Sequence, residues 1–86
     1  MLNRAAMAFE HDQTLVDKHV GAQIEARRSD IRLSRSELGH MLDYSEAEIA
    51  AWESGRMRIS ASKLFQLAKV LRVPVAYFFE PYLQDQ

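Results

Sequence analysis

The three histidines of this chain, His11, His19 and His40, are the first candidates for acid–base chemistry or metal binding, because imidazole titrates near neutral pH and is a common metal ligand. Their spacing from one another and from carboxylates matches no metal-binding motif, and the chain has no HExxH sequence, glycine-rich phosphate loop or nucleophile elbow. We therefore predict no catalytic residue, no metal site, no cofactor and no small-molecule ligand. The protein is not expected to be an enzyme.

A second group of side chains could bind phosphate, because arginines and the free N–H groups of helix starts attract anions. The group lies in and around residues 33–55: Ser34, Arg35, Ser36, Tyr44, Arg56, Arg58, Ser60 and Lys63. The formal net charge is −1, but residues 18–72 contain ten Lys and Arg against seven Asp and Glu. Each loop arginine alone fits a solvated charge equally well, and Tyr44 fits simple packing equally well. As a group around residues 33–55, the arginines favour DNA.

Two short helices are predicted within residues 33–55. Each begins with a serine followed three residues later by a glutamate, which is the capping-box pattern; the pairs are Ser34 with Glu37 and Ser45 with Glu48. Gly55 can adopt the left-handed conformation that ends a helix. Only residues 42–44 separate the two helices, so the chain must reverse sharply there. Two capped helices around so short a turn form a helix-turn-helix unit.

This segment resembles the Cro/repressor-like, or XRE-like, helix-turn-helix family of small bacterial regulators. The matching motifs are Leu33-Ser34-x-x-Glu37-Leu38, Ser45-x-x-x-Ile49-x-x-Trp52-Glu53-x-Gly55, and the flanking Val20-Gly21-x-x-Ile24-x-x-Arg27-Arg28 and Val73-Pro74-Val75-x-x-Phe78-Phe79-Glu80. The resemblance covers about residues 17–81. It implies an all-α, compact five-helix bundle of the phage-repressor-like DNA-binding domain type, with the helix-turn-helix formed by helices two and three. It also implies that double-stranded DNA is the partner.

The resemblance assigns base recognition to the second helix of the motif. The outward positions there are Ser45, Glu46, Ala47, Ala50 and Ala51. Glu46 could accept a hydrogen bond from cytosine N4, and Ala47 or Ala50 could pack on a thymine methyl group. The family usually carries polar or basic residues here, and this face offers no bidentate Arg–guanine or Gln–adenine pair. A second interpretation therefore stays open, in which the fold is kept but binds a protein, as in an antitoxin-type or accessory subunit.

Arg28 is the charged residue that most needs a structural explanation. It falls on the apolar stripe of the first predicted helix, together with Val20, Ile24 and Ile31. A buried guanidinium without a partner is very costly. The resemblance implies that Arg28 pairs with Glu53, which would tie the first helix to the third.

The remaining organisation is that of one small domain. We expect a partly disordered N-terminal arm over residues 1–16, the helix-turn-helix domain over 17–81 and a short tail over 82–86. The central core residues should be Leu33, Leu38, Leu42, Ile49, Trp52, Leu64, Leu67, Leu71 and Phe78. The chain has no cysteine and no apolar run near the ~20 residues of a membrane span. A cytoplasmic protein without membrane association is the expectation.

A domain of this size offers little surface for tight specific binding, so we expect a homodimer on palindromic DNA. Aromatic and apolar residues near the C-terminus are the predicted dimer contact: Val75, Tyr77, Phe78, Phe79 and Tyr82. Closure of the monomer core by the same residues is the alternative. The function that results is that of a dimeric transcriptional regulator, in most cases a repressor, that blocks access to its operator.

Overall fold

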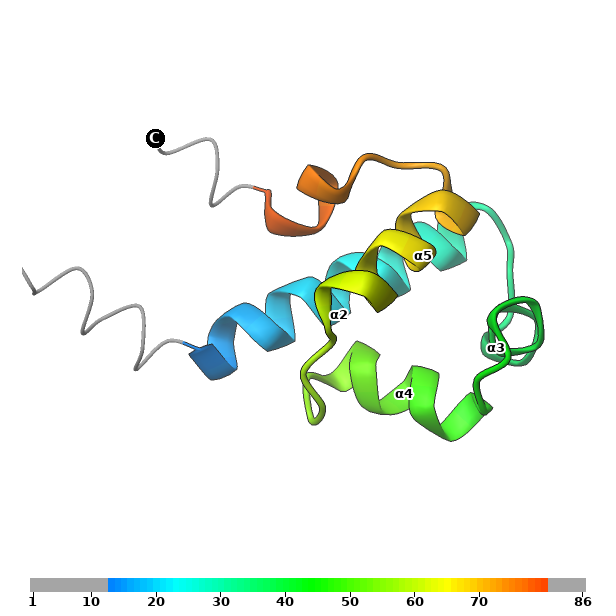
Figure 1. The fold of residues 1–86 in the computed structure, drawn as a ribbon, viewed down its shortest axis with the longest axis horizontal. Coiled ribbons are helices and arrows are strands. Elements are labelled where there is room, and N and C mark those ends of the chain that lie inside the picture. The colour runs from blue at the N-terminus through cyan, green and yellow to red at the C-terminus, as the bar shows by residue number, and fades with distance from the viewer. Residues whose placement is uncertain (1–12, 81–86) are drawn as a thin grey trace, which may run out of the picture.

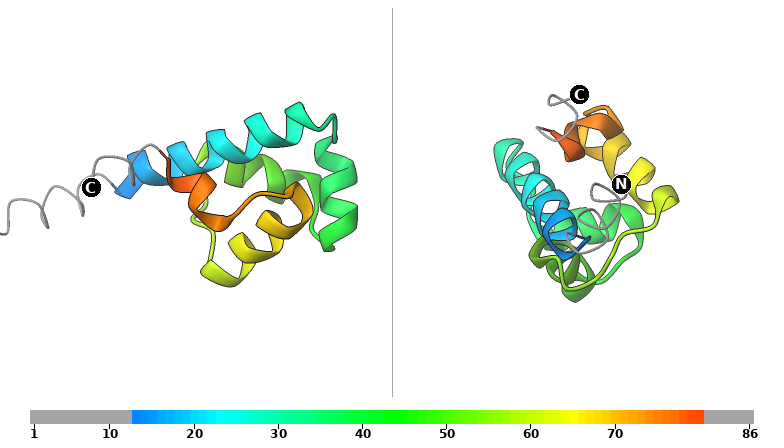
Figure 2. Two further views of the ribbon diagram at one scale, coloured as in Figure 1. Left: turned by 90° about the horizontal axis from the view of Figure 1, so that it is seen from above. Right: turned by 90° about the vertical axis from the view of Figure 1, so that its left-hand side faces the viewer.

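The computed structural model describes residues 13–80, and the regular elements in this part of the chain are all helices, joined by short loops (Figure 1). Its elements are α2 (Gln13–Asp30), α3 (Arg35–Leu42), α4 (Glu46–Ser54), α5 (Ala61–Leu71) and the 3₁₀ helix η1 (Val75–Phe79). Seen along the long axis, α2 lies on one side, α5 and η1 lie opposite, and α4 closes the bottom (Figure 2). The all-α prediction is therefore confirmed for the described residues.

One boundary and one helix type differ from the prediction. The first described helix begins at Gln13, within the range assigned to the arm, and Val16 already packs against the core. The fifth predicted helix is the 3₁₀ helix η1, so a bundle of five α-helices is not confirmed. Pro74 precedes this element and Pro81 follows it closely, and a segment so short suits one tight turn better than an α-helix. The rest of the predicted arm lies outside the described residues.

The core is built where α2 crosses α4 and where α5 and η1 cover them. Most of the predicted core is buried: Leu38, Ile49, Trp52, Leu64, Leu67, Leu71 and Phe78, joined by Val20 and Ile24 of α2. Leu33 and Leu42 are only partly buried at its edge. The two helices approach closely at Gly21, where an added Cβ would lie 2.2 Å from the Trp52 carbonyl oxygen. Only glycine fits this crossing without moving α4.

Local hydrogen bonds fix both helix starts of the motif, as the sequence predicts. The Ser34 hydroxyl accepts from the Glu37 N–H at 2.9 Å, and the Glu37 carboxylate accepts from the Ser34 N–H at 2.8 Å. Ser45 and Glu48 form the same reciprocal pair. Ser60 caps α5 in a simpler way, by accepting from the backbone of Lys63. The capping boxes thus set where α3 and α4 begin.

The reversal between α3 and α4 depends on two unusual backbone positions. Asp43 caps α3 in the left-handed region at φ 66°, where most side chains are disfavoured. The chain then returns against Gly39, whose carbonyl accepts from the Tyr44 N–H at 2.8 Å. A Cβ at Gly39 would lie 2.4 Å from the Tyr44 carbonyl oxygen. Only glycine at position 39 therefore leaves room for a turn this tight.

Gly39→Ala should destabilise the domain, because its methyl group collides with backbone that cannot yield easily. We expect a loss of about 1–3 kcal/mol in the free energy of unfolding, measured by urea denaturation. The matched control is His40→Ala at the exposed neighbouring position, which should change stability by less than about 0.5 kcal/mol. Equal stability of the two variants would contradict the close approach.

The first capping box makes stability depend on pH through Glu37. Hydrogen bonds from the backbone and side chain of Ser34 lower the pKa of the Glu37 carboxyl below its ordinary value of 4.5. A group whose pKa is lower in the folded state stabilises above its unfolded pKa, and this stabilisation is lost as the pH falls through the folded pKa. The stability difference between wild type and Glu37→Gln should therefore shrink as the pH falls below about 4.5. Urea denaturation across pH 3–7 measures it, and a constant difference would contradict the linkage.

Candidate nucleic-acid interface

The carboxylate of Glu53 holds the helices of the helix-turn-helix in position through its contacts. Glu53 lies in the last turn of α4, and its side chain is only 2% exposed. Arg28 of α2 donates to it twice, from Nε to Oε2 at 2.6 Å and from Nη2 to Oε1 at 3.2 Å. The Nη1 group of Arg28 donates to the Leu33 carbonyl oxygen at 2.8 Å. The predicted ion pair between Arg28 and Glu53 is confirmed.

Arg35 supplies a second cation to the same carboxylate, which the sequence did not reveal. Its Nε donates to Glu53 Oε1 at 2.7 Å, and its Nη2 lies 3.6 Å from Glu25 Oε2. The hydrogen bond to Glu53, and then the charge of Glu53, raise the pKa of Arg35. The sequence predicts Arg35 as a phosphate contact, but its guanidinium is engaged in joining α3 to α4. No local spacing signals this contact, because it links the first turn of α3 to the last turn of α4.

The start of α4 is the exposed part of the predicted recognition helix. Ser45, Glu46 and Ala47 are exposed, and Ala50 is half-buried. The outward placement of Ala51 is wrong, since only 8% of it is exposed. The loop after α4 folds back over Ala51, where the N–H groups of Arg56 and Met57 point to the Ala51 carbonyl oxygen. Ala51 thus belongs to the core side of α4.

Tyr44 packs in the turn, and its hydroxyl is engaged within the domain. Its ring lies edge-on to Trp52 with centroids 4.9 Å apart, and its hydroxyl donates to Gln66 Oε1 at 3.3 Å. Lys63, predicted to meet phosphate, places its Nζ 5.4 Å from the centroid of the Tyr44 ring. That distance permits a cation–π contact. The packing alternative for Tyr44 is therefore the one that the geometry favours.

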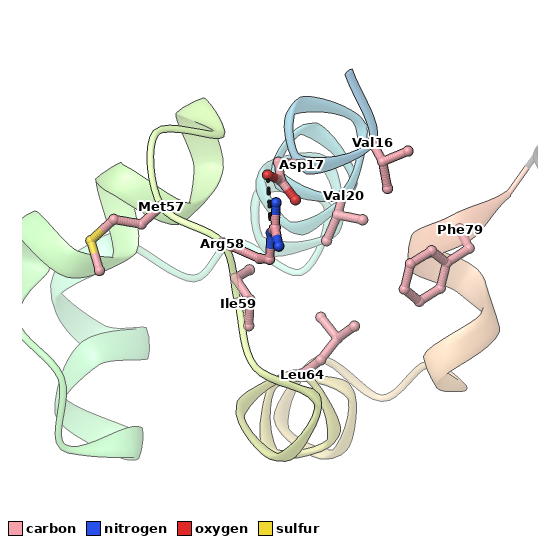
Figure 3. A pocket seen from close by; sticks show the side chains of 8 residues that line it. All are labelled: Val16, Asp17, Val20, Met57, Arg58, Ile59, Leu64 and Phe79. Carbon is pink, nitrogen blue, oxygen red and sulfur yellow. Dashed lines mark ion pairs between the residues drawn. The ribbon is translucent and has the colours of Figure 1, made fainter. Parts of the chain in front are cut away.

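The loop arginines remain exposed while making weak contacts within the domain. Arg56 Nε donates to Ser54 Oγ at 3.0 Å, and Arg58 Nε lies 3.6 Å from Asp17 Oδ2. The Arg58–Asp17 pair lies beside a pocket of about 180 Å³ between α2, the loop, α5 and η1. Figure 3 shows the pair among the side chains that line the pocket. Two thirds of the Arg58 side chain stays in solvent. Both guanidinium groups therefore remain accessible to a phosphate.

The serines predicted near phosphate divide into two kinds. The hydroxyl oxygens of Ser34 and Ser60 accept from backbone N–H groups as helix caps. Ser36 lies exposed in the first turn of α3. The starts of α3 and α5 thus carry the positive ends of their helix dipoles at exposed positions.

The aromatic cluster near the C-terminus is divided between core and surface. Phe78 is completely buried, so its assignment as a dimer contact is wrong. It fills the core where η1 packs on α2 and α5, and the Tyr77 ring lies edge-on to it at 5.6 Å. Val75, Tyr77 and Phe79 are half-buried and keep an exposed side. Tyr82 lies outside the described residues.

Neither a metal site nor a membrane span is found between residues 13 and 80. No group of three or more His, Cys, Asp or Glu side chains there could hold a metal ion. None of the described helices is long and apolar enough to cross a membrane.

Removal of the Glu53 carboxylate should be strongly destabilising. Glu53→Ala leaves the buried guanidinium of Arg28 unpaired, and we expect a loss of roughly 3–5 kcal/mol in the free energy of unfolding. Glu25→Ala is the control, because it removes the half-exposed carboxylate that contacts Arg35; it should cost about 0–1 kcal/mol. Thermal and urea denaturation measure both variants. Similar losses would contradict the central role of Glu53.

A helix-turn-helix family model matches residues 24–78, from the middle of α2 to η1. No solved structure matches the chain significantly.

Several curated bacterial proteins match most of this chain. An uncharacterized transcriptional regulator in the ATPase CF(0) region of Rhodospirillum rubrum is 44% identical over 64 residues, covering 74% of this chain and 59% of its own length. Uncharacterized HTH-type transcriptional regulators of Sinorhizobium medicae and Sinorhizobium fredii are 38% and 37% identical; they cover 76% and 96% of this chain and 47% and 58% of their own lengths. The chain spans about half the length of these relatives. Together with the family model, they place it in the XRE-like helix-turn-helix family of transcriptional regulators.

Proposed function

We propose that the protein is a sequence-specific DNA-binding transcriptional regulator, acting as a repressor, whose helix α4 enters the major groove. The observation that carries this proposal is the division of α4 into an exposed start and a buried end. Glu46 and Ala47 face solvent, whereas Trp52 and Glu53 are locked into the core. A recognition helix needs both properties, because its first residues touch base edges while its far end holds it in place.

The surroundings of α4 supply contacts for the DNA backbone. The starts of α3 and α5 offer N–H groups and positive dipole ends, and Arg56 and Arg58 extend into solvent between α4 and α5. Ser36 and Lys63 lie in the first turns of these two helices. Such contacts fix the position of the protein on DNA but carry no sequence information.

A homodimer on a palindromic operator follows from the small size of the domain. The exposed sides of Val75, Tyr77 and Phe79 are the proposed dimer contact. Two α4 helices would then lie about 34–36 Å apart, one turn of DNA. A dimer bound there would exclude polymerase or a competing protein, which is the proposed basis of repression in the cytoplasm.

The alternative is that α4 binds a protein, as in an antitoxin-type or accessory subunit. One observation favours it: the exposed start of α4 carries a carboxylate and methyl groups but no cationic side chain. Selection of fragmented genomic DNA by the purified protein at low salt, followed by sequencing, separates the two. An enriched palindrome supports a specific regulator, whereas no retention of DNA overturns the proposal and directs a pull-down at α4.

The loop arginines generate a prediction about salt dependence. Arg56→Ala with Arg58→Ala should weaken binding to all DNA sequences similarly. The plot of log K against log salt concentration should become less steep. Each phosphate contact that is lost reduces the size of the slope by nearly one, so the double variant should reduce it by up to about two. Fluorescence anisotropy at several salt concentrations measures the slope, and an unchanged slope would contradict the phosphate role.

A matched control removes the same charge elsewhere. Lys69→Ala with Arg72→Gly deletes two cations near the opposite end of α5, and glycine suits the left-handed backbone of Arg72 at φ 61°. An α-helix of eleven residues is about 16 Å long, so this end lies away from the loop. The salt slope of this variant should stay close to that of the wild type.

A further inference from the structure

The exposed start of α4 has an unusual chemical character for a surface that faces base edges. Glu46 and Ala47 are exposed, and Ala50 is half-buried beside them. The Glu48 carboxylate accepts from the Ser45 N–H, and the Ser45 hydroxyl accepts from the Glu48 N–H, so both groups are engaged in the cap. What remains for a partner is one carboxylate, the methyl groups of two alanines and the O–H of Ser45, whose oxygen is already used as an acceptor in the cap.

These groups select a narrow set of base edges in the major groove. A carboxylate accepts hydrogen bonds from the exocyclic amines of cytosine and adenine, and it is repelled by the acceptors of guanine and by thymine O4. Alanine methyl groups are stabilised by contact with other methyl groups. In unmodified DNA, the only methyl group in the major groove is the C5-methyl of thymine. A cytosine methylated at C5 presents the amine and the methyl group on the same edge.

We propose that α4 reads pyrimidine C5-methyl groups through Ala47 and Ala50 and a cytosine amine through Glu46, so that methylation of cytosine at C5 strengthens operator binding. This inference rests on the proposed function, because it names the bases that the same site recognises. It also assigns a modified base as the ligand that this face fits best.

The surrounding charges make a carboxylate tolerable at this position. Arg35 lies close enough that the negative charge of Glu46 contributes, after Glu53 and Glu25, to raising the pKa of Arg35. The Glu46 carboxylate also lies in the first turn of α4, where the helix dipole favours negative charge. A guanidinium and the positive end of a helix dipole therefore both favour a carboxylate at this position.

The test uses the operator recovered by selection from genomic DNA, synthesised with single modified bases. Replacing thymine by uracil removes one methyl group and nothing else. At each contacted position the dissociation constant of the wild-type protein should rise about three- to fivefold, the factor expected for one buried methyl group. Replacing cytosine by 5-methylcytosine at the position read by Glu46 should lower it by a similar factor.

Variants then assign the effect to α4. At the position that Ala47 contacts, Ala47→Gly should have the same dissociation constant for thymine- and uracil-containing operators. The substitution removes the methyl group that makes the contact. Ala26→Gly is the matched control on the exposed side of α2, and it should keep the full discrimination. Glu46→Ala should lose the cytosine preference and bind non-operator DNA more tightly, since a negative charge near phosphates is gone.

The outcomes separate this inference from the function on which it rests. Equal affinity for thymine- and uracil-containing operators at every position, or no gain in affinity from 5-methylcytosine, would overturn the methyl readout. Specific binding that persisted in either case would still support the proposed regulator. Retention of DNA without an enriched motif would also overturn the methyl readout, because no base edge would then be read. Failure to bind any duplex would overturn both.

Discussion

The structure depends above all on one buried carboxylate. Glu53 accepts from Arg28 of α2 and from Arg35 of α3, so a single side chain of α4 joins these three helices. A buried ion pair adds little net stability compared with apolar residues, yet breaking it is costly. We expect it to act by restricting α4 to one arrangement against its neighbours. The domain is small and its core is thin, so such a constraint has a large share in fixing the fold.

The same helix therefore serves two purposes along its length. Its last turns contribute Trp52 and Glu53 to the core, and its first turn stands in solvent behind the Ser45 cap. Because the buried end is fixed on two sides, the exposed end is presented in a defined position. The close approach at Gly21 and the tight return at Gly39 complete this arrangement, since both let backbone segments touch.

The exposed start of α4, which is the proposed recognition surface, has no cationic side chain and presents the methyl groups of two alanines. Specificity from such a face would come from shape and from repulsion of wrong base edges as much as from hydrogen bonds. Affinity would then depend on the phosphate contacts flanking α4 and on a second subunit. Arg56 and Arg58 suit this role because their internal contacts are few and largely exposed.

The sequence by itself determined the features that depend on neighbours within a few residues. The two capping boxes, the turn at residues 42–44 and the left-handed end at Gly55 follow from side chains three residues apart and from backbone preference. The position of Arg28 on an apolar stripe predicted that it has a partner, and the family resemblance identified that partner as Glu53. Only the tertiary structure decided the burial of Ala51 and Phe78 and the engagement of Arg35 by Glu53. These depend on which distant segments fold over a residue, and the spacing along a single helix does not contain that information.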